Sequence, residues 1–331
     1  MKLTAFGPGI AAAVATAILV QANAAHAQRV DGSFVRTLAA GERADIAITS
    51  GSGGIDVRRG AAGRIEVRGR IRADDWGWSR NRYSAEERVK RLEANPPIEQ
   101  KGDSIRIGDI SDPDLRNGVS ITYEVTVPPG SSLRAKSGSG AQRIEGVDGD
   151  LEASSGSGSV VVRNSGGPVR ASTGSGGITV EDVGGAFQAS TGSGSIRAVG
   201  IKGSMNARTS SGSIDLAQTA SGDVDASSSS GSVRLRGVRG GLRASTSSGA
   251  LNVEGQVARD WHLSSSSGHV TVSVPASQGF DLDANSSSGR IDVGFPITVS
   301  GTIGKHALRG SARGGGPLVQ VRTTSGGISV R

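Results

Sequence analysis

A Ser-Gly pair returns at a nearly constant interval along this 331-residue chain. From Gly140 to Gly289 the paired glycines are 18, 18, 18, 18, 19, 18, 19 and 21 residues apart. A flexible linker has no reason to keep such a register, whereas periods near 20 residues are typical of stacked repeats. An early copy, GSGGIDV, begins at Gly51, and a late copy, TSGGISV, begins at Thr324. The interval predicts a chain folded into similar coils.

Each repeat contains two short runs in which apolar and polar residues alternate. The first run carries pairs such as Ile178 and Val180, and the second carries a large residue followed by alanine, as in Leu242 and Ala244. Alternation with period two indicates a strand with one buried face. One such unit cannot bury its apolar face alone, so the units must stack. We therefore predict an all-β fold, a parallel β-solenoid (β-helix) of about 18 residues per coil.

The coil corners are rich in glycine, serine and threonine. We expect the corner glycines to adopt positive φ, which glycine tolerates without a Cβ penalty. The hydroxyls, as in Ser190-Thr191 and Thr246-Ser247, recur coil after coil. They either satisfy backbone groups of the turns or present a repetitive hydroxyl face to a glycan or to ice. The first role is the one that we expect.

The N-terminus has the features of a secretory signal peptide, residues 1–27. Met1-Lys2 precedes an apolar run from Ile10 to Val20, and the sequence AHA ends at Ala27. Such a run is short for a membrane span, although an uncleaved anchor is the alternative. We predict cleavage after Ala27, export to the periplasm or the cell surface, and no membrane span in the mature chain. There is no cysteine, so neither disulfides nor a lipid-attachment cysteine are available.

Residues 28–136 are less regular and are predicted to be an N-terminal β region that carries one short helix, about 84–94. Ser84 and Glu87 have the spacing of a capping box, and Pro96-Pro97 follows the helix. Trp76, Trp78 and Tyr83 lie just before it, where they could bind a sugar or pack the helix as a cap over the open end of the solenoid. Residues 137–331 are predicted to form the solenoid, with a looped C-terminal rung.

The formal net charge is +7, and the densest local group of cations follows Gly231. A basic group of this kind either binds an anionic polysaccharide, a lipid headgroup or nucleic acid, or is a solvated face. No aromatic residues lie between these cations and the chain carries an export signal, which argues against nucleic acid. The candidate ligand surface consists of Arg234, Arg236, Arg239 and Arg243.

The repeats resemble a bacterial family of β-strand-repeat domains named putative adhesins. The resemblance rests on the Ser-Gly-x-Ile/Val-x-Val units, on SITYEVTVPPGSSLRAKSGSG (Ser120 to Gly140), and on VQVRTTSGGISV at the C-terminus. It covers nearly the whole mature chain. It implies an exported β-solenoid and supplies no catalytic residues.

Motifs for cofactor, metal or nucleophile chemistry are incomplete. GSGSVV at Gly156 and GTIGKHA at Gly301 lack the full spacing of phosphate-binding loops. Calcium-binding β-rolls need Asp in the turns, where this chain has Ser, Thr and Gly. In Asp260-Trp261-His262 both polar residues should point outward around a buried Trp, without a nucleophile turn. We therefore expect no catalytic site, no cofactor and no metal.

The leading hypothesis is a non-catalytic adhesion or interaction module, with an envelope glycan or a surface protein as partner. A polysaccharide-active lyase or hydrolase is the first alternative, since outward carboxylate pairs could act as acid and base. A structural envelope protein that self-associates end to end through an uncapped rung is the second. The carboxylate pairs are Asp150/Glu152, Asp223/Asp225 and Asp281/Asp283.

Overall fold

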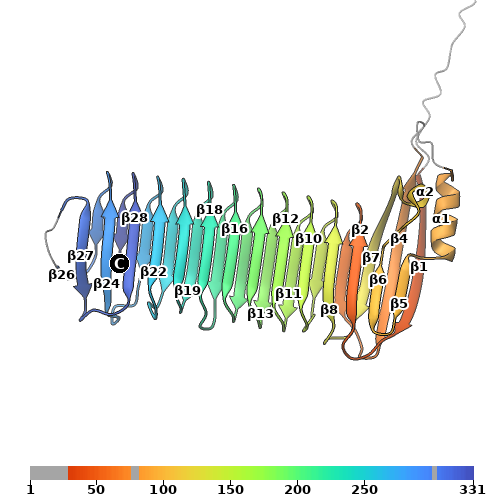
Figure 1. The fold of residues 1–331 in the computed structure, drawn as a ribbon, viewed down its shortest axis with the longest axis horizontal. Coiled ribbons are helices and arrows are strands. Elements are labelled where there is room, and N and C mark those ends of the chain that lie inside the picture. The colour runs from red at the N-terminus through yellow and green to blue at the C-terminus, as the bar shows by residue number, and fades with distance from the viewer. Residues whose placement is uncertain (1–28, 76–81, 300–303) are drawn as a thin grey trace, which may run out of the picture.

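The computed structural model describes residues 29–75, 82–299 and 304–331, which form a straight rod (Figure 1). The strands lie side by side across the long axis, and the chain passes along the rod from the end that carries α1 (Ala85–Ala94). The predicted parallel β-solenoid is confirmed, with only two short helices, α1 and α2 (Pro113–Arg116), among the described residues. The signal-peptide prediction concerns residues outside this range.

Two long sheets form the opposite walls of the rod. Sheet A has 14 strands, in the spatial order β1 (Arg29–Ala39), β4 (Arg64–Asp74), β7 (Val119–Val127), β3 (Ile55–Arg59), β9 (Gln142–Glu145), β11 (Val160–Ser165), β13 (Ile178–Val183), β15 (Ile196–Ile201), β17 (Ile214–Gln218), β19 (Val233–Val238), β21 (Leu251–Gly255), β23 (Val270–Ser273), β29 (Ile328–Val330), β25 (Ile291–Val293). Sheet B has 15 strands, in the order β26 (Thr298–Val299), β27 (Ala307–Ala312), β24 (Phe280–Ser286), β28 (Leu318–Thr323), β22 (Trp261–Ser265), β20 (Leu242–Thr246), β18 (Val224–Ser228), β16 (Met205–Thr209), β14 (Phe187–Thr191), β12 (Val169–Thr173), β10 (Leu151–Ser155), β8 (Ser132–Ser137), β2 (Asp45–Ser50), β6 (Ser104–Ile107), β5 (Ile98–Lys101).

Like residues lie over like residues, as the period predicts. Between β12 and β14, Val169 pairs with Phe187 and Ala171 with Ala189, and all four are buried. The alanine column lets the two walls approach closely, and the larger column fills the remaining width of the thin core. Trp261 occupies the larger column at 0% exposure. Its indole N–H donates to the Gly240 carbonyl at 3.0 Å, so the buried polar atom is satisfied.

The expectation of positive φ at the Ser-Gly corners is wrong. The positive-φ glycines lie elsewhere, for example at Gly146, Gly200 and Gly237. At the corners a Cβ on Gly176 would lie 2.1 Å from the carbonyl oxygen of Gly158, and one on Gly194 would lie 1.8 Å from that of Gly176. Glycine is needed there because each corner rests directly on the backbone of the previous one.

The buried hydroxyl at each corner joins two successive coils. Thr191 accepts a hydrogen bond from the Gly194 amide at 3.1 Å and donates one to the Gly176 carbonyl of the preceding coil at 3.0 Å. Thr173 and Thr209 repeat the same pair of bonds one coil before and one coil after. The predicted role of these hydroxyls in satisfying turn backbone groups is confirmed for this buried column.

Parallel stacking begins well before residue 137. β2 pairs with β8 in parallel register, Ile46 opposite Leu133, and β3 pairs with β9. The division expected at residue 136 falls inside β8, and the stacking crosses it. β7, β4 and β1 then extend sheet A, with β4 antiparallel to both of its neighbours.

Helix α1 covers this N-terminal extension (Figure 1). It begins after Ser84, which forms the predicted capping box with Glu87. Val89 packs against Gly32 of β1, and Glu93 accepts a hydrogen bond from the Ser33 amide at 2.8 Å. Arg88 is fully buried and bonds to the Asp74 carbonyl, to the Asn117 carbonyl and to the Asp75 carboxylate.

Of the three aromatics that precede this helix, Trp76 and Trp78 lie outside the described residues. Tyr83 lies under the Arg91 guanidinium, 4.1 Å from its ring centroid.

Tyr123 on β7 gives the N-terminal region a pH-dependent stability. Its ring is 1% exposed and lies edge-on to Phe34, and burial raises the pKa of its hydroxyl. The folded-state pKa is therefore above the unfolded-state value of about 10, so stability is lost as the pH rises past about 10. In that range the free energy of unfolding should fall by about 1.4 kcal/mol per pH unit, and we expect Tyr123→Phe to abolish this fall. Urea unfolding at a series of alkaline pH values measures this slope.

Tyr83→Phe, at the only other tyrosine of the chain, is the control for that slope. It removes a phenol that is only half-buried, and its slope is compared with that of Tyr123→Phe, which removes the buried one. Equal slopes for the parent and Tyr123→Phe would contradict the expectation.

The final coil in the sequence is not the final coil of the rod. β28 lies between β22 and β24, and β29 lies between β23 and β25. The coil that contains β24 and β25 is therefore displaced outward by one position, and β27 and β26 extend sheet B beyond it in antiparallel pairing. The wider spacing before Gly289 reflects this skipped position.

Candidate functional site

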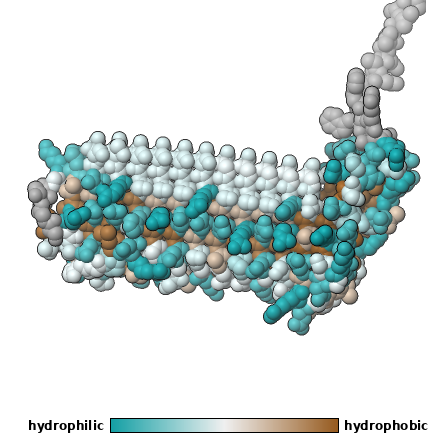
Figure 2. Space-filling model, in the orientation of Figure 1, coloured by the Kyte–Doolittle hydropathy of each residue, from teal (hydrophilic) through white to brown (hydrophobic). Residues whose placement is uncertain are grey.

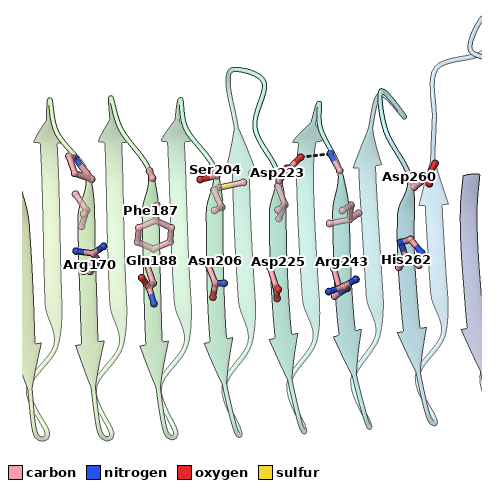
Figure 3. A pocket seen from close by; sticks show the side chains of 17 residues that line it. Arg170, Phe187, Gln188, Ser204, Asn206, Asp223, Asp225, Arg243, Asp260 and His262 are labelled. Carbon is pink, nitrogen blue, oxygen red and sulfur yellow. Dashed lines mark hydrogen bonds between the residues drawn. The ribbon is translucent and has the colours of Figure 1, made fainter. Parts of the chain in front are cut away.

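A shallow groove of about 510 Å³ lies on the outer face of sheet B (Figure 3). It crosses the strands β12, β14, β16, β18, β20 and β22, whose pairing places one outward polar side chain of each coil in a row. The row consists of Arg170, Gln188, Asn206, Asp225, Arg243 and His262. Neighbouring members are one strand spacing apart, about 4.8 Å.

The carboxylates at this groove are bound to protein groups. Asp225 pairs with Arg208 at 3.6 Å. Asp223 pairs with Arg259 at 2.5 Å and accepts a hydrogen bond from the Gly241 amide at 2.7 Å. Asp260 accepts a hydrogen bond from the Leu318 amide at 2.9 Å. Two of the three carboxylates, Asp223 and Asp225, are thus neutralised by an arginine.

The cations in the row itself are available. Arg170 and Arg243 are exposed, and the side chain of neither has an ion pair or a hydrogen bond among the residues that the structure describes. They lie four strand spacings apart, about 19 Å. Gln188, Asn206 and Asp225 lie between them (Figure 3). A continuous row of polar side chains thus lies between the two exposed guanidinium groups.

The four predicted arginines are divided between the two walls of the rod. Arg234 and Arg236 lie on β19 in sheet A, and Arg236 pairs with Asp215 at 2.8 Å. Arg239 lies in the turn that follows, where its amide donates to the Gln218 side chain at 3.2 Å. Only Arg243 lies in the groove on sheet B. The structure therefore does not bring the four together, since the coil turns from one wall to the other between them.

Arg170 and the outward polar side chains of the neighbouring coils are the groove residues that sequence reasoning did not single out as a ligand surface. In the sequence, these residues occupy the outward polar position of the second alternating run of each repeat, which recurs at intervals of about 18 residues. Comparing that position from coil to coil would have found them, whereas looking for a local cluster of charge does not.

The predicted carboxylate pairs do not form a joint acid–base centre. Glu152 pairs with Arg134 at 3.3 Å. Asp281 accepts a hydrogen bond from Ser311 at 2.7 Å, and Asp283 lies 3.2 Å from Arg309. Asp223 and Asp225 bind different arginines, not Arg243 as their register would allow. Their outward position matches the sequence, but each of these carboxylates is bound by a group from another strand or coil.

A second polar surface runs along the Ser-Gly corners next to the groove. Figure 2 shows it as a pale band along one long edge of the rod, beside a band of charged residues. It includes a hollow of about 580 Å³ that is lined largely by serine and threonine, among them Ser229, Ser247 and Ser266.

The side chain of His262 points outward from β22, as predicted, and that of Trp261 points into the core.

In residues 29–75, 82–299 and 304–331, no group of three or more His, Asp or Glu side chains could hold a metal ion. No helix in these ranges has the length and apolar character to cross a membrane.

The solved structures that align with this chain come from bacteria and are remote in sequence. A putative cell adhesion protein from Clostridium sporogenes aligns over 91% of this chain and 99% of its own, at 10% identity and a TM-score of 0.19. A putative adhesin from Parabacteroides distasonis aligns over 90% and 97%, at 9% identity and a TM-score of 0.39. A protein from the same organism described as a putative lipid binding protein aligns over 91% and 97%, at 13% identity and a TM-score of 0.37.

Among curated proteins, no sequence matches this chain. The pattern of one family, however, matches residues 122–331, which is more than half of the chain and includes every coil that follows β8. This match bears out the resemblance to a family of β-strand-repeat domains. The chain belongs to the Toastrack DUF4097 family.

Proposed function

We propose that this protein is a non-catalytic, exported interaction module that holds an extended anionic envelope glycan along the outer face of sheet B. The observation that carries the proposal is the groove across six coils with two unpaired arginines, Arg170 at one end and Arg243 on the last strand but one at the other. The signal-like N-terminus supports a place in the periplasm or at the cell surface.

An extended polymer suits this surface better than a small molecule does. The groove is shallow and open, and its polar groups repeat at one strand spacing, about 4.8 Å. The separation of Arg170 and Arg243, about 19 Å, requires a ligand that passes over several coils. A linear chain of sugars can offer a hydroxyl or a carboxylate at each step.

The chemistry of the groove favours charge and hydrogen bonding over stacking. Its aromatic residue, Phe187, is buried, and the only exposed large apolar side chain among the described residues is Val35, on β1 at the N-terminal end of the rod. A guanidinium binds a carboxylate through two parallel hydrogen bonds. Asn206 and Gln188 can both donate to and accept from sugar hydroxyls.

The bound state of the carboxylates supports the non-catalytic part of the proposal. A glycosidase needs one carboxylic acid in surroundings that keep its proton and a second group placed across the bond. Asp223 and Asp225 instead each pair with an arginine of another strand or loop, and neither carboxylate is paired with the other across the groove.

Binding of the mature chain to polygalacturonate, a linear carboxylated glycan, tests the proposal. We expect Arg243→Gln to weaken binding about tenfold, which corresponds to about 1.4 kcal/mol, because one bidentate contact to a carboxylate is lost. The affinity of Arg243→Lys should lie between those of the parent protein and of Arg243→Gln, since lysine keeps the charge but not the fork geometry. Isothermal titration at two salt concentrations gives both the affinity and its electrostatic share.

Arg234→Gln is the matched control, because it removes the same charge from the opposite wall of the same coil. It should leave the affinity unchanged. Equal losses for both variants, or absence of binding to carboxylated glycans, would refute the proposed surface. Release of reducing ends from the glycan over time would refute the non-catalytic role.

A further inference from the structure

The coil formed by residues 318–331 occupies a slot inside the rod. Its corner glycine, Gly326, rests on the Gly268 carbonyl, and Gly289 in turn rests on the Gly326 carbonyl. The slot therefore lies between the coil of β22 and β23 and the coil of β24 and β25. Both of these coils come earlier in the sequence than the segment that separates them.

The slot binds its segment on both edges and through its side chains. Towards the coil of β22 and β23, the Val270 amide donates to the Gly327 carbonyl and the Arg331 amide donates to the Val272 carbonyl, both at 2.9 Å. Towards the coil of β24 and β25, the Ile328 amide donates to the Arg290 carbonyl at 2.9 Å. Four aliphatic side chains of the segment are fully buried between these coils: Val319, Val321, Ile328 and Val330. This is the way in which a donated strand completes a sheet.

The connection into the slot is built as a hinge with a latch. Gly314, Gly315 and Gly316 all have positive φ and precede Pro317. Arg313 fastens the start of the hinge, since its guanidinium donates to the Pro275 carbonyl at 3.2 Å and to the Gln278 carbonyl at 3.1 Å. It also stacks on Phe295, 4.5 Å from the ring centroid. Released from these contacts, residues 313–317 could span about 17 Å when extended.

We propose that this slot is a strand-exchange site through which two copies of the protein join, each copy placing its residues 318–331 in the slot of the other. The exchanged segment keeps every contact that it makes within one copy, so only the hinge changes conformation. The ends of the rod suit stacking less well: β1 carries α1, and antiparallel β27 and β26 extend sheet B beyond the last parallel coil. The inference is independent of glycan binding.

Engineered cysteines test the exchange directly, because the chain has no cysteine of its own. Ser264 on β22 and Arg322 on β28 are in-register partners with outward side chains. A full chain with Ser264→Cys is mixed with a full chain with Arg322→Cys at high concentration, and disulfides are formed with oxidised glutathione. Strand exchange between the copies yields covalent mixed dimers.

The pair Ser227→Cys and Ser245→Cys is the matched control. These two serines are also in-register partners on sheet B, but both belong to coils that follow each other in sequence. We expect about tenfold more mixed dimer from the slot pair than from the control pair. Arg313→Ala in the slot pair should raise the rate of dimer formation by about tenfold, because it opens the latch.

Equal yields of mixed dimer from the two pairs would overturn the proposal. If Arg322→Cys does not fold, His262→Cys with Gln320→Cys tests the same register. The Ser264/Arg322 double variant at low concentration should form a disulfide within one copy, which confirms that the cysteines can react.

Discussion

Gly176→Ala is expected to lower the free energy of unfolding by about 3 kcal/mol, at the upper end of the usual cost of overpacking. The new Cβ would lie 2.1 Å from the carbonyl oxygen and 2.5 Å from the carbonyl carbon of Gly158. Both obstacles are backbone atoms, so no side chain can move aside to relieve the contact. The two coils must separate locally, and the Gly158 carbonyl also accepts a hydrogen bond from Thr173 that this separation would weaken. Urea unfolding followed by circular dichroism measures the change.

The neighbouring residue provides a control at the same corner. A Cβ on Gly177 has only the Ser195 carbonyl within 4 Å, at 3.6 Å, which is ordinary contact. Gly177→Ala should therefore change the stability by no more than about 0.5 kcal/mol. Similar losses for both variants would show that glycine is needed at these corners for its backbone freedom, and not for the close approach of successive coils.

The difference between Gly176 and Gly177 also shows where sequence reasoning stops. The interval of about 18 residues was sufficient to predict the parallel coils, the column of Ala171 and Ala189, and the inward position of Trp261, because stacking places equivalent residues over each other. A repeated glycine, however, has two physical explanations, positive φ or close approach. The sequence does not distinguish them, and the structure shows the second at the corners.

Two other features were hidden for topological reasons. Arg236 and Arg243 are seven residues apart and form one cluster in the sequence, yet the turn after β19 sends them to opposite walls. Arg170 and Arg243 are far apart in the sequence and lie in one row. Likewise, the wide spacing before Gly289 marked an irregularity, but a period cannot tell that residues 318–331 fill the gap. Local periodicity fixes which side of a strand is buried, and it does not fix the spatial order of coils once the chain leaves the period.

Thr191→Val is expected to cost about 2 kcal/mol, since it keeps the shape of the side chain and removes two hydrogen bonds. The Gly194 amide would lose its acceptor, and the Gly176 carbonyl would lose a donor, in a corner that is almost fully buried. Valine is a better strand former than most residues, so strand propensity alone would predict no loss. A clear loss in chemical unfolding would thus measure the hydroxyl contacts.

Thr191→Ser and Ser190→Ala complete the argument. Serine occupies the equivalent position in other coils, at Ser155, Ser228 and Ser265, and makes the same bond to the glycine amide three residues on. Thr191→Ser should therefore recover most of the stability, whereas Ser190→Ala, at the exposed neighbour, should change it by less than about 0.5 kcal/mol. The Thr191 hydroxyl bonds the carbonyl of Gly176, so the losses from Thr191→Val and Gly176→Ala should not add in the double variant. Strict additivity would mean that the hydroxyl column and the glycine column stabilise the stack independently, contrary to the shared corner in which both lie.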